Sequence, residues 1–87
     1  MKSSRWFVYI IKNEMGHLYT GITTDIERRF SEHAQSSKGA KFFRRSAPVS
    51  IVFSKEFANR SEASKCEAQI KKLRRAKKLE IIQKGDL

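Results

Sequence analysis

Residues 6–33 read WFVYIIKNEMGHLYTGITTDIERRFSEH, and this stretch decides how the chain folds. It begins with a nearly continuous run of β-branched and aromatic residues, which is typical of a strand buried on both faces. A second such run, Leu18–Ile22, follows a turn that contains Gly16. The pattern of an amphipathic helix comes directly afterwards. The stretch therefore predicts a β-hairpin that leads into a helix.

The turn of this hairpin determines which side chains share a face. A three-residue loop over 14–16, with Gly16 in the left-handed conformation, is a common hairpin connection. It pairs Tyr9 with Gly21, so that Tyr9 and Tyr19 become diagonal neighbours on one face. A two-residue loop would place the tyrosines on opposite faces, because one step of register turns every side chain over. We predict the three-residue loop, which leaves an apolar layer on the other face, made of Val8, Ile10, Leu18 and Ile22.

The rest of the chain predicts one more strand and three helices. A capping box at Thr24–Glu27 starts the first helix at Asp25, and residues 36–39 end it. The later elements are a strand at Pro48–Phe53, a helix capped by Asn59 and a short helix over 76–83. The helical residues expected to face the core are Ile26, Phe30, Ala34, Ala63, Cys66, Ile70, Leu73, Leu79 and Ile82. The order β-β-α-β-α-α predicts an α+β fold, a small and mainly antiparallel three-stranded sheet flanked by helices.

Composition limits the class of protein. With 87 residues, of which 39% are hydrophobic and 32% charged, we expect a single globular domain over 1–87 with its core at about 5–82. The sequence contains no run of about 18 apolar residues, so it predicts no membrane span. The N-terminus lacks the apolar segment of a signal peptide. The lone Cys66 favours a reducing cytoplasm and is expected to pack as a small hydrophobe on a helix. The sequence does not determine the oligomeric state, although a monomer is favoured.

Positive charge is the strongest feature of the composition. Lys and Arg outnumber Asp and Glu by 19 to 9, which favours a polyanionic partner, nucleic acid ahead of an anionic membrane. The candidate phosphate-binding residues form two runs without an acidic residue, namely Lys38, Lys41, Arg44 and Arg45, then Lys71, Lys72, Arg74, Arg75, Lys77 and Lys78. Phe42 and Phe43 within the first run could stack on unpaired bases, but ordinary packing is the favoured interpretation.

The residues suited to chemistry are ordinary when taken one at a time. Tyrosine is common in strands, and Arg29 with His33, one helical turn apart, would usually form a solvated helix face. A single glutamate such as Glu67 is usually just exposed. Only their combination points to a site.

That combination resembles the signature of the GIY-YIG nucleases. The matching motifs are Phe7-Val8-Tyr9, Tyr19-Thr20-Gly21, Asp25-Ile26 with Arg29, then His33 and the later Glu67. The segments Leu18–Thr23, Lys38–Lys41 and Arg60–Ala63 resemble the small, single-domain bacterial branch of that superfamily. The resemblance spans about residues 5–82, and it lies in five motifs that occur in order at suitable spacing.

The resemblance implies a metal-dependent phosphodiesterase that hydrolyses DNA, with RNA as the second choice, and leaves a 5′-phosphate and a 3′-hydroxyl. Glu67 would be the sole protein carboxylate on one Mg²⁺ or Mn²⁺ ion, which suits a hard cation that keeps several waters. Low sequence specificity is expected, because phosphate contacts position a substrate without reading its bases. A role in DNA repair or on unusual DNA structures would follow.

The resemblance also implies roles for the other matching residues. Tyr9 would orient or deprotonate the attacking water, although a phenol is a weak base near neutrality. Arg29 would stabilise the charge that develops on the phosphate. Tyr19 and His33 would hydrogen-bond the phosphate or position the water, and Gly21 would keep the backbone clear.

The chain departs from the family pattern at a few positions. Phe7 stands where the first motif begins with glycine, and the asparagine that many relatives carry late in the domain has no counterpart beyond Asn13 and Asn59. The alternative interpretation is therefore a nucleic-acid-binding module that has lost catalysis. A basic structural protein of a ribonucleoprotein would explain the charge alone. Because the five candidate catalytic residues occur together, the nuclease is favoured.

Overall fold

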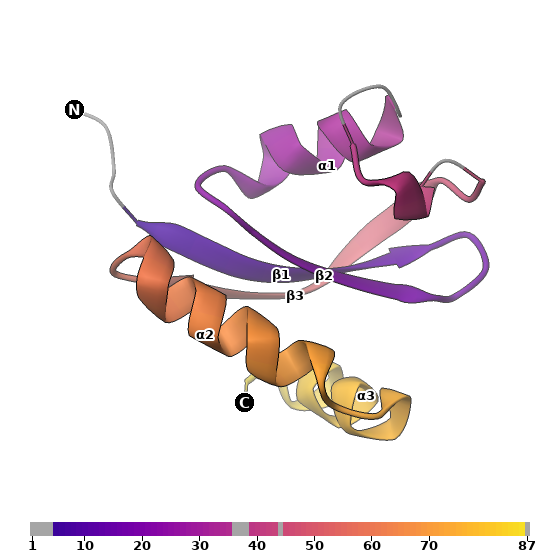
Figure 1. The fold of residues 1–87 in the computed structure, drawn as a ribbon. Coiled ribbons are helices and arrows are strands. Elements are labelled where there is room, and N and C mark those ends of the chain that lie inside the picture. The colour runs from indigo at the N-terminus through magenta and orange to yellow at the C-terminus, as the bar shows by residue number, and fades with distance from the viewer. Residues whose placement is uncertain (1–4, 36–38, 44, 87) are drawn as a thin grey trace.

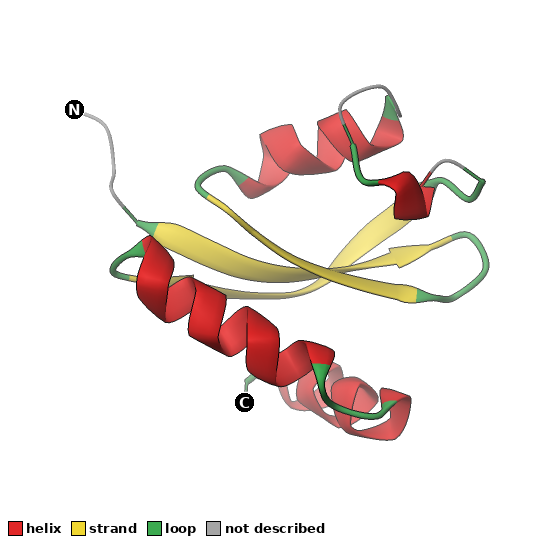
Figure 2. Ribbon diagram, viewed as in Figure 1, coloured by secondary structure: helices red, strands yellow, loops and turns green. Residues whose placement is uncertain are grey.

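The computed structural model describes residues 5–35, 39–43 and 45–86, and it contains one sheet with helices on both faces (Figure 1). The elements are β1 (Trp6–Asn13), β2 (Leu18–Thr23), α1 (Ile26–Ala34), the short 3₁₀ helix η1 (Lys41–Phe43), β3 (Pro48–Phe57), α2 (Arg60–Lys71) and α3 (Arg75–Lys84). The strand order is β2-β1-β3, and both pairings are antiparallel. Figure 2 shows α1 and η1 on one face of the sheet and α2 and α3 on the other. The predicted α+β fold and its element order are confirmed.

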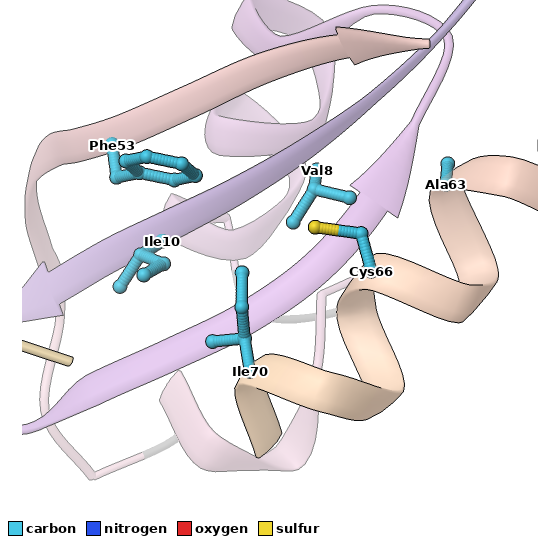
Figure 3. Close-up of a cluster of buried hydrophobic side chains, with 6 residues drawn as sticks. All are labelled: Val8, Ile10, Phe53, Ala63, Cys66 and Ile70. Atoms are coloured by element: carbon cyan, nitrogen blue, oxygen red, sulfur yellow. The ribbon is translucent and has the colours of Figure 1, made fainter. Parts of the chain in front are cut away.

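β1 is the central strand, and its alternate side chains enter two separate cores. Val8 and Ile10 point to the face covered by α2, where they meet Phe53 of β3 (Figure 3). The helix contributes Ala63, Cys66 and Ile70 to this core, so the predicted packing of Cys66 as a small hydrophobe is confirmed. Burial of such side chains stabilises the fold by about 25 cal/mol per Å² of apolar surface.

The second core lies between the sheet and α1. It is built on Tyr9 and Ile11 of β1 with Phe43 of η1, and Tyr19, Ile26, Phe30 and Ala40 pack around them. A tyrosine hydroxyl and a buried histidine thus stand where only apolar atoms would normally be expected. This face of the sheet is the polar one, and it carries the candidate site.

The β1–β2 hairpin has the predicted register. Its pairs include Tyr9 with Gly21 and Ile11 with Tyr19, and Gly16 adopts the left-handed conformation at φ 82°. The turn is closed by Asn13, whose buried Oδ1 atom accepts hydrogen bonds from the N–H groups of Met15 at 3.0 Å and His17 at 2.8 Å. These bonds satisfy two turn donors and hold the register in place.

The first helix differs from its prediction at its start and in its buried face. Asp25 is the N-cap and its carboxylate accepts the N–H of Arg28 at 3.1 Å, so the helix begins at Ile26, one residue later than predicted. Ala34 is exposed, and His33 is the buried residue of this helix. The predicted helix end at 36–39 includes residues 36–38, which lie outside the described residues.

The later elements also differ in extent. β3 runs to Phe57, beyond the predicted Phe53, because its polar second half pairs with the start of β1. α2 is capped by Asn59, as predicted, whose Oδ1 accepts the N–H of Glu62 at 2.9 Å. In α3 the predicted anchor Leu79 is exposed, whereas the predicted anchor Ile82 packs against the core as expected, together with Ile81. No helix within the described ranges is long and apolar enough to cross a membrane.

The Asn13 contacts give a prediction about stability. Asn13→Ala removes a buried acceptor and leaves two turn N–H groups without their partner, so the free energy of unfolding should fall by about 1–3 kcal/mol. Asn59→Ala makes the same chemical change at an exposed helix cap and should cost about 1 kcal/mol. Urea unfolding of both variants checks the order. An Asn59→Ala variant less stable than Asn13→Ala would contradict it.

Candidate active site

Tyr9 and Tyr19 lie side by side on the face of the sheet that α1 covers. The centroids of their rings are 6.3 Å apart, as the hairpin register requires. Tyr9 is only 1% exposed, whereas Tyr19 is partly buried. The prediction that both tyrosines share one face is confirmed, and they occupy different depths of it.

Gly21 gives the Tyr9 ring its room. A Cβ atom at position 21 would overlap the Tyr9 hydroxyl and would lie 2.7 Å from its Cζ atom. Because the Tyr9 ring is enclosed in a close-packed core, it could not simply move aside. A side chain at this position would therefore displace the phenol.

His33 holds the Tyr9 hydroxyl from α1. Its Nε2 atom lies 3.0 Å from Tyr9 Oη, and its Nδ1 atom accepts a hydrogen bond of 3.1 Å from the backbone N–H of Ala40. A ring nitrogen that accepts a hydrogen bond carries no proton, so a neutral His33 has its proton on Nε2. These two contacts assign the tautomer. His33 donates to Tyr9, and the phenolic proton of Tyr9 is left to point elsewhere.

The surroundings of His33 keep it uncharged. Ring centroids around it belong to Phe43 at 4.6 Å, Tyr19 at 5.3 Å and Tyr9 at 6.1 Å. Burial, followed by the positive charge of Arg29, lowers the pKa of His33 to about 4, while the charge of Glu32 acts in the opposite direction. A neutral imidazole at pH 7 agrees with the tautomer that the hydrogen bonds assign.

The contacts of His33 favour a different role from the one that the resemblance implies, which stays a prediction. Both of its ring nitrogens are bonded inside the protein and its side chain is 0% exposed, so it does not face a phosphate or a solvent water. The reason is the rotation of α1, which turns His33 rather than Ala34 into the core. His33 acts on Tyr9.

Arg29 stands one turn before His33 on α1 and acts on the same phenol. A hydrogen bond and the positive charge of Arg29 both lower the pKa of Tyr9. Its Nη1 atom also forms an ion pair of 2.9 Å with Glu32 Oε1, and the side chain remains 28% exposed. A guanidinium group has five N–H donors, so it can bond these neighbours and still offer donors to a phosphate.

Tyr9 is a very weak acid in the protein alone. Burial raises the pKa of its phenol to about 12, and the charges of Tyr19 and Glu67 add to the rise that Arg29 opposes. The phenol is therefore fully protonated at neutral pH. Further positive charge close to the phenol would lower this pKa.

Glu67 comes from α2, on the other side of the sheet (Figure 1). Its side chain is 22% exposed, and its carboxylate forms an ion pair of 3.3 Å with Lys71. It is near enough to Tyr9 for its charge to raise the pKa of the phenol. Side chains from β1, α1 and α2 thus act on one hydroxyl group.

The donor set around Glu67 restricts which metal could bind. Within the described part of the chain, no three His, Cys, Asp or Glu side chains gather into a metal cluster. A single carboxylate fits Mg²⁺ or Mn²⁺, because a hard ion of this kind keeps several waters and takes further oxygen ligands from a substrate phosphate. It does not fit zinc, which takes three or four protein ligands. Lys71 would have to release the carboxylate first.

The candidate phosphate-binding residues lie in two places. Those that are exposed are Lys41 and Arg45 near η1, and Lys71, Lys72, Arg74, Arg75 and Lys77 at the junction of α2 and α3. Lys78 is partly buried. Lys38 and Arg44 lie outside the described residues.

Both basic segments are tied to the tip of the β1–β2 hairpin. Arg75 Nη2 donates a hydrogen bond of 2.9 Å to the carbonyl of Gly16. After η1, the N–H of Ala47 donates to Glu14 Oε1 at 2.9 Å, and the N–H of Glu14 donates to the carbonyl of Ala47 at 3.0 Å. Two runs that are distant in sequence therefore flank the same end of the sheet.

The phenylalanines of the first run have different surroundings. Phe43 is buried in the second core, which confirms ordinary packing for this residue. Phe42 is 36% exposed and lies against Tyr19, with 5.3 Å between the ring centroids. Phe42 therefore borders the site while Phe43 supports it.

The sequence did not reveal three partners in this site. Glu32 pairs with Arg29, and only its spacing of three residues on a helix pointed to that contact. Phe43 and the backbone of Ala40 reach His33 from the segment after α1. Contacts made by a backbone N–H leave no signal in residue type.

Comparison with known proteins gives consistent matches along the chain. The profile of a family described as "GIY-YIG catalytic domain" matches residues 5–80. The UPF0213 protein YhbQ of Escherichia coli K12 is 42% identical over 80 residues, which cover 92% of this chain and 79% of that protein. A UPF0213 protein of Desulfotalea psychrophila is 46% identical over 81 residues, covering 93% of this chain and 74% of the relative. The solution NMR structure of the UPF0213 protein BH0048 from Bacillus halodurans has a TM-score of 0.59 and 38% identity, covering 91% of this chain and 83% of that one.

The buried His33 predicts how stability depends on pH. Because the pKa of His33 is about 4 in the folded protein and about 6.5 in the unfolded chain, only the unfolded chain takes up a proton between these values. The contribution of neutral His33 to the free energy of unfolding is fully present above pH 6.5. It is lost as the pH falls towards 4, by roughly 3 kcal/mol in total.

Denaturant unfolding from pH 7.5 to 4.5 measures this loss. His33→Gln should flatten the acid slope relative to the wild type, whereas His17→Gln, at an exposed residue of the hairpin turn, should keep it. Equal slopes for the wild type and His33→Gln would show that His33 is not the group responsible.

Proposed function

The chain belongs to the GIY-YIG family, and on that premise we propose that it is a divalent-metal-dependent endonuclease that hydrolyses phosphodiester bonds in DNA. The observation that supports the proposal is that His33 and Arg29 both act on the Tyr9 hydroxyl. The Glu67 carboxylate is near enough for its charge to affect the pKa of the same hydroxyl. Phosphodiester hydrolysis requires a general base, a cationic group that stabilises the phosphate, and a carboxylate that can hold a metal ion.

Tyr9 is the proposed base. The Nε2–H of His33 donates to Tyr9 Oη, which stabilises the phenolate more than the phenol because a bond to a charged acceptor is stronger. Tyr9 first releases its phenolic proton to solvent when nearby positive charge has lowered its pKa. The phenolate then takes a proton from the attacking water as the water oxygen bonds to phosphorus. The bond between phosphorus and O3′ then breaks, and the departing O3′ takes a proton from a solvent water. These steps yield the 5′-phosphate and 3′-hydroxyl that the resemblance implies.

Arg29 and a metal ion held by Glu67 are proposed to supply the positive charge that this step needs. Arg29 already lowers the pKa of Tyr9, and its exposed donors are proposed to bond the phosphate in the transition state. Glu67 is proposed to hold Mg²⁺ or Mn²⁺, which when bound would supply further positive charge beside the phosphate. Tyr19 borders the same space, and Gly21 keeps it open.

Substrate binding is proposed to be electrostatic. The exposed basic residues flank the hairpin tip on both sides, so a nucleic-acid backbone that crosses the edge of the sheet at β2 could contact both groups. Contacts of this kind position the phosphates and carry no sequence information, which supports low specificity. We further propose DNA with nicks or branches as the substrate and the cytoplasm as the compartment. The free, buried Cys66 is in keeping with the compartment.

A nucleic-acid-binding module without catalysis is the second candidate. The observation that favours it is the high pKa of Tyr9, about 12, in a site whose carboxylates Glu32 and Glu67 are already paired with Arg29 and Lys71. A phenol of this kind is inert unless a metal ion and a phosphate complete the site. Turnover with and without the metal therefore separates the two candidates.

The decisive experiment incubates the protein with nicked, branched and single-stranded DNA and with RNA, in Mg²⁺ or in chelator. We expect cutting in Mg²⁺ alone, a loss of roughly 10²–10⁴-fold in rate for Glu67→Gln, and binding that persists in this variant. Glu80→Gln, at an exposed residue of α3, is the matched control and should cut normally.

Cleavage in chelator, or full activity of Glu67→Gln, would contradict the proposed role of Glu67. Salt-sensitive binding to every substrate with no cleavage of any would establish the binding module. For either function the logarithm of the affinity should fall linearly with the logarithm of the salt concentration.

A further inference from the structure

We propose that Gly39 and Ala40 are positioning residues that fix the tautomer of His33 and, through it, the direction of the hydrogen bond to Tyr9. The catalytic consequence of this inference rests on the proposed nuclease function. Its geometric part does not, because it concerns contacts within the protein. No residue of this pair touches the reacting atoms in the mechanism above.

Ala40 supplies its donor from the backbone. Its N–H group lies 3.1 Å from His33 Nδ1, seven residues back in the chain. A backbone N–H can donate but cannot accept, so Nδ1 must be the acceptor. A hydroxyl group in the same place could do either and would leave the tautomer open. The backbone contact thus makes His33 an acceptor at Nδ1 and a donor to Tyr9 at Nε2.

Gly39 lets this backbone approach α1. A Cβ atom at position 39 would overlap the Cα of His33 and would lie 2.8 Å from the Glu32 carbonyl oxygen and 3.0 Å from the His33 nitrogen. These are backbone atoms of a helix, which cannot swing away as the end of a long side chain could. The positive-φ glycines of the described chain are Gly16 and Gly85, so position 39 needs glycine for its close contact alone.

The other side of Ala40 is also fixed. Its carbonyl accepts a hydrogen bond of 3.0 Å from the N–H of Phe43, and Phe43 packs on the His33 ring at 4.6 Å between centroids. Ala40 itself belongs to the second core. The segment 39–43 therefore forms a frame that holds the His33 ring by contact and by a hydrogen bond.

The direction of the bond matters for the proposed base. With the proton on Nε2, His33 donates to Tyr9 and stabilises its phenolate, while the phenolic proton can leave towards the substrate. With the proton on Nδ1, Nε2 would become an acceptor and Tyr9 would donate its own proton into the core. The phenolate would then lose its donor, and Tyr9 would be a poorer base.

The ionisable groups that face His33 do not decide its tautomer. They are Arg29 and Glu32 from α1, Tyr9 from β1 and Tyr19 from β2, while η1 contributes the uncharged Phe43. The nearest charges, on Arg29 and Glu32, have opposite effects on the pKa of His33. They bear on whether the ring is charged, whereas the contact with Ala40 decides which nitrogen holds the proton of the neutral ring.

Nitrogen NMR of ¹⁵N-labelled histidine tests the geometric part without any substrate. The wild type should show His33 with its proton on Nε2, with the His17 signals assigned through His17→Gln. Gly39→Ala, which pushes the segment off α1, and Ala40→Pro, which deletes the N–H, should both shift His33 to a mixture of tautomers. Gly85→Ala is the control, because a Cβ atom there meets nothing within 4 Å and its φ of 76° strains only the end of α3, away from the site.

The catalytic part is tested on the DNA substrate that the wild type cuts. Gly39→Ala and Ala40→Pro should lower kcat roughly 10–100-fold with KM nearly unchanged and should move the pH–rate profile to higher pH, whereas Gly85→Ala should keep wild-type kinetics. Folded variants that retain the wild-type tautomer would overturn the proposal. A wild type with its proton on Nδ1 would overturn it too, even if neither variant folds. A protein that cuts nothing would remove the proposed function and leave the NMR result to decide this inference.

Discussion

The hydrogen bond between Tyr9 and His33 joins the central strand to the first helix, and the rest of the site depends on it. The bond needs the three-residue turn that places Tyr9 on the α1 face, and it needs Gly21 beneath the ring. It also needs the rotation of α1 that buries His33. A one-residue change in the hairpin register would remove it, because every side chain of β1 or β2 would change face.

In the proposed mechanism, this arrangement makes Tyr9 a latent base. Burial stabilises the neutral phenol, while His33 and Arg29 are placed to stabilise the phenolate once more positive charge arrives. A buried polar group of this kind contributes less to stability than an apolar side chain would, unless its hydrogen bonds are made. The site thus uses core volume that an ordinary domain would fill with apolar side chains, and the opposite core around Val8 and Ile10 maintains the fold.

The parts of the structure that residue patterns predicted are those set by local rules. The hairpin register followed from Gly16 and alternation, and the α2 cap followed from Asn59. The patterns did not show which residue of α1 would be buried, because His33 and Ala34 are neighbours and the apolar spacing favoured Ala34. Nor could they show the Ala40 contact, since every residue except proline has the same backbone donor. The prediction that Glu67 lies near Tyr9 came from the family resemblance and not from residue spacing.

The pKa of Tyr9, measured by NMR of ¹³Cζ-labelled tyrosine, tests this account most directly. The chain has two tyrosines, so Tyr19→Phe assigns both signals. The account predicts that the pKa of Tyr9 is about 12 in the free protein and that it falls by roughly 2–3 units when Mg²⁺ and an uncleavable DNA are added together. A pKa of Tyr9 near 10 in the free protein, or one that does not change in the complex, would contradict it.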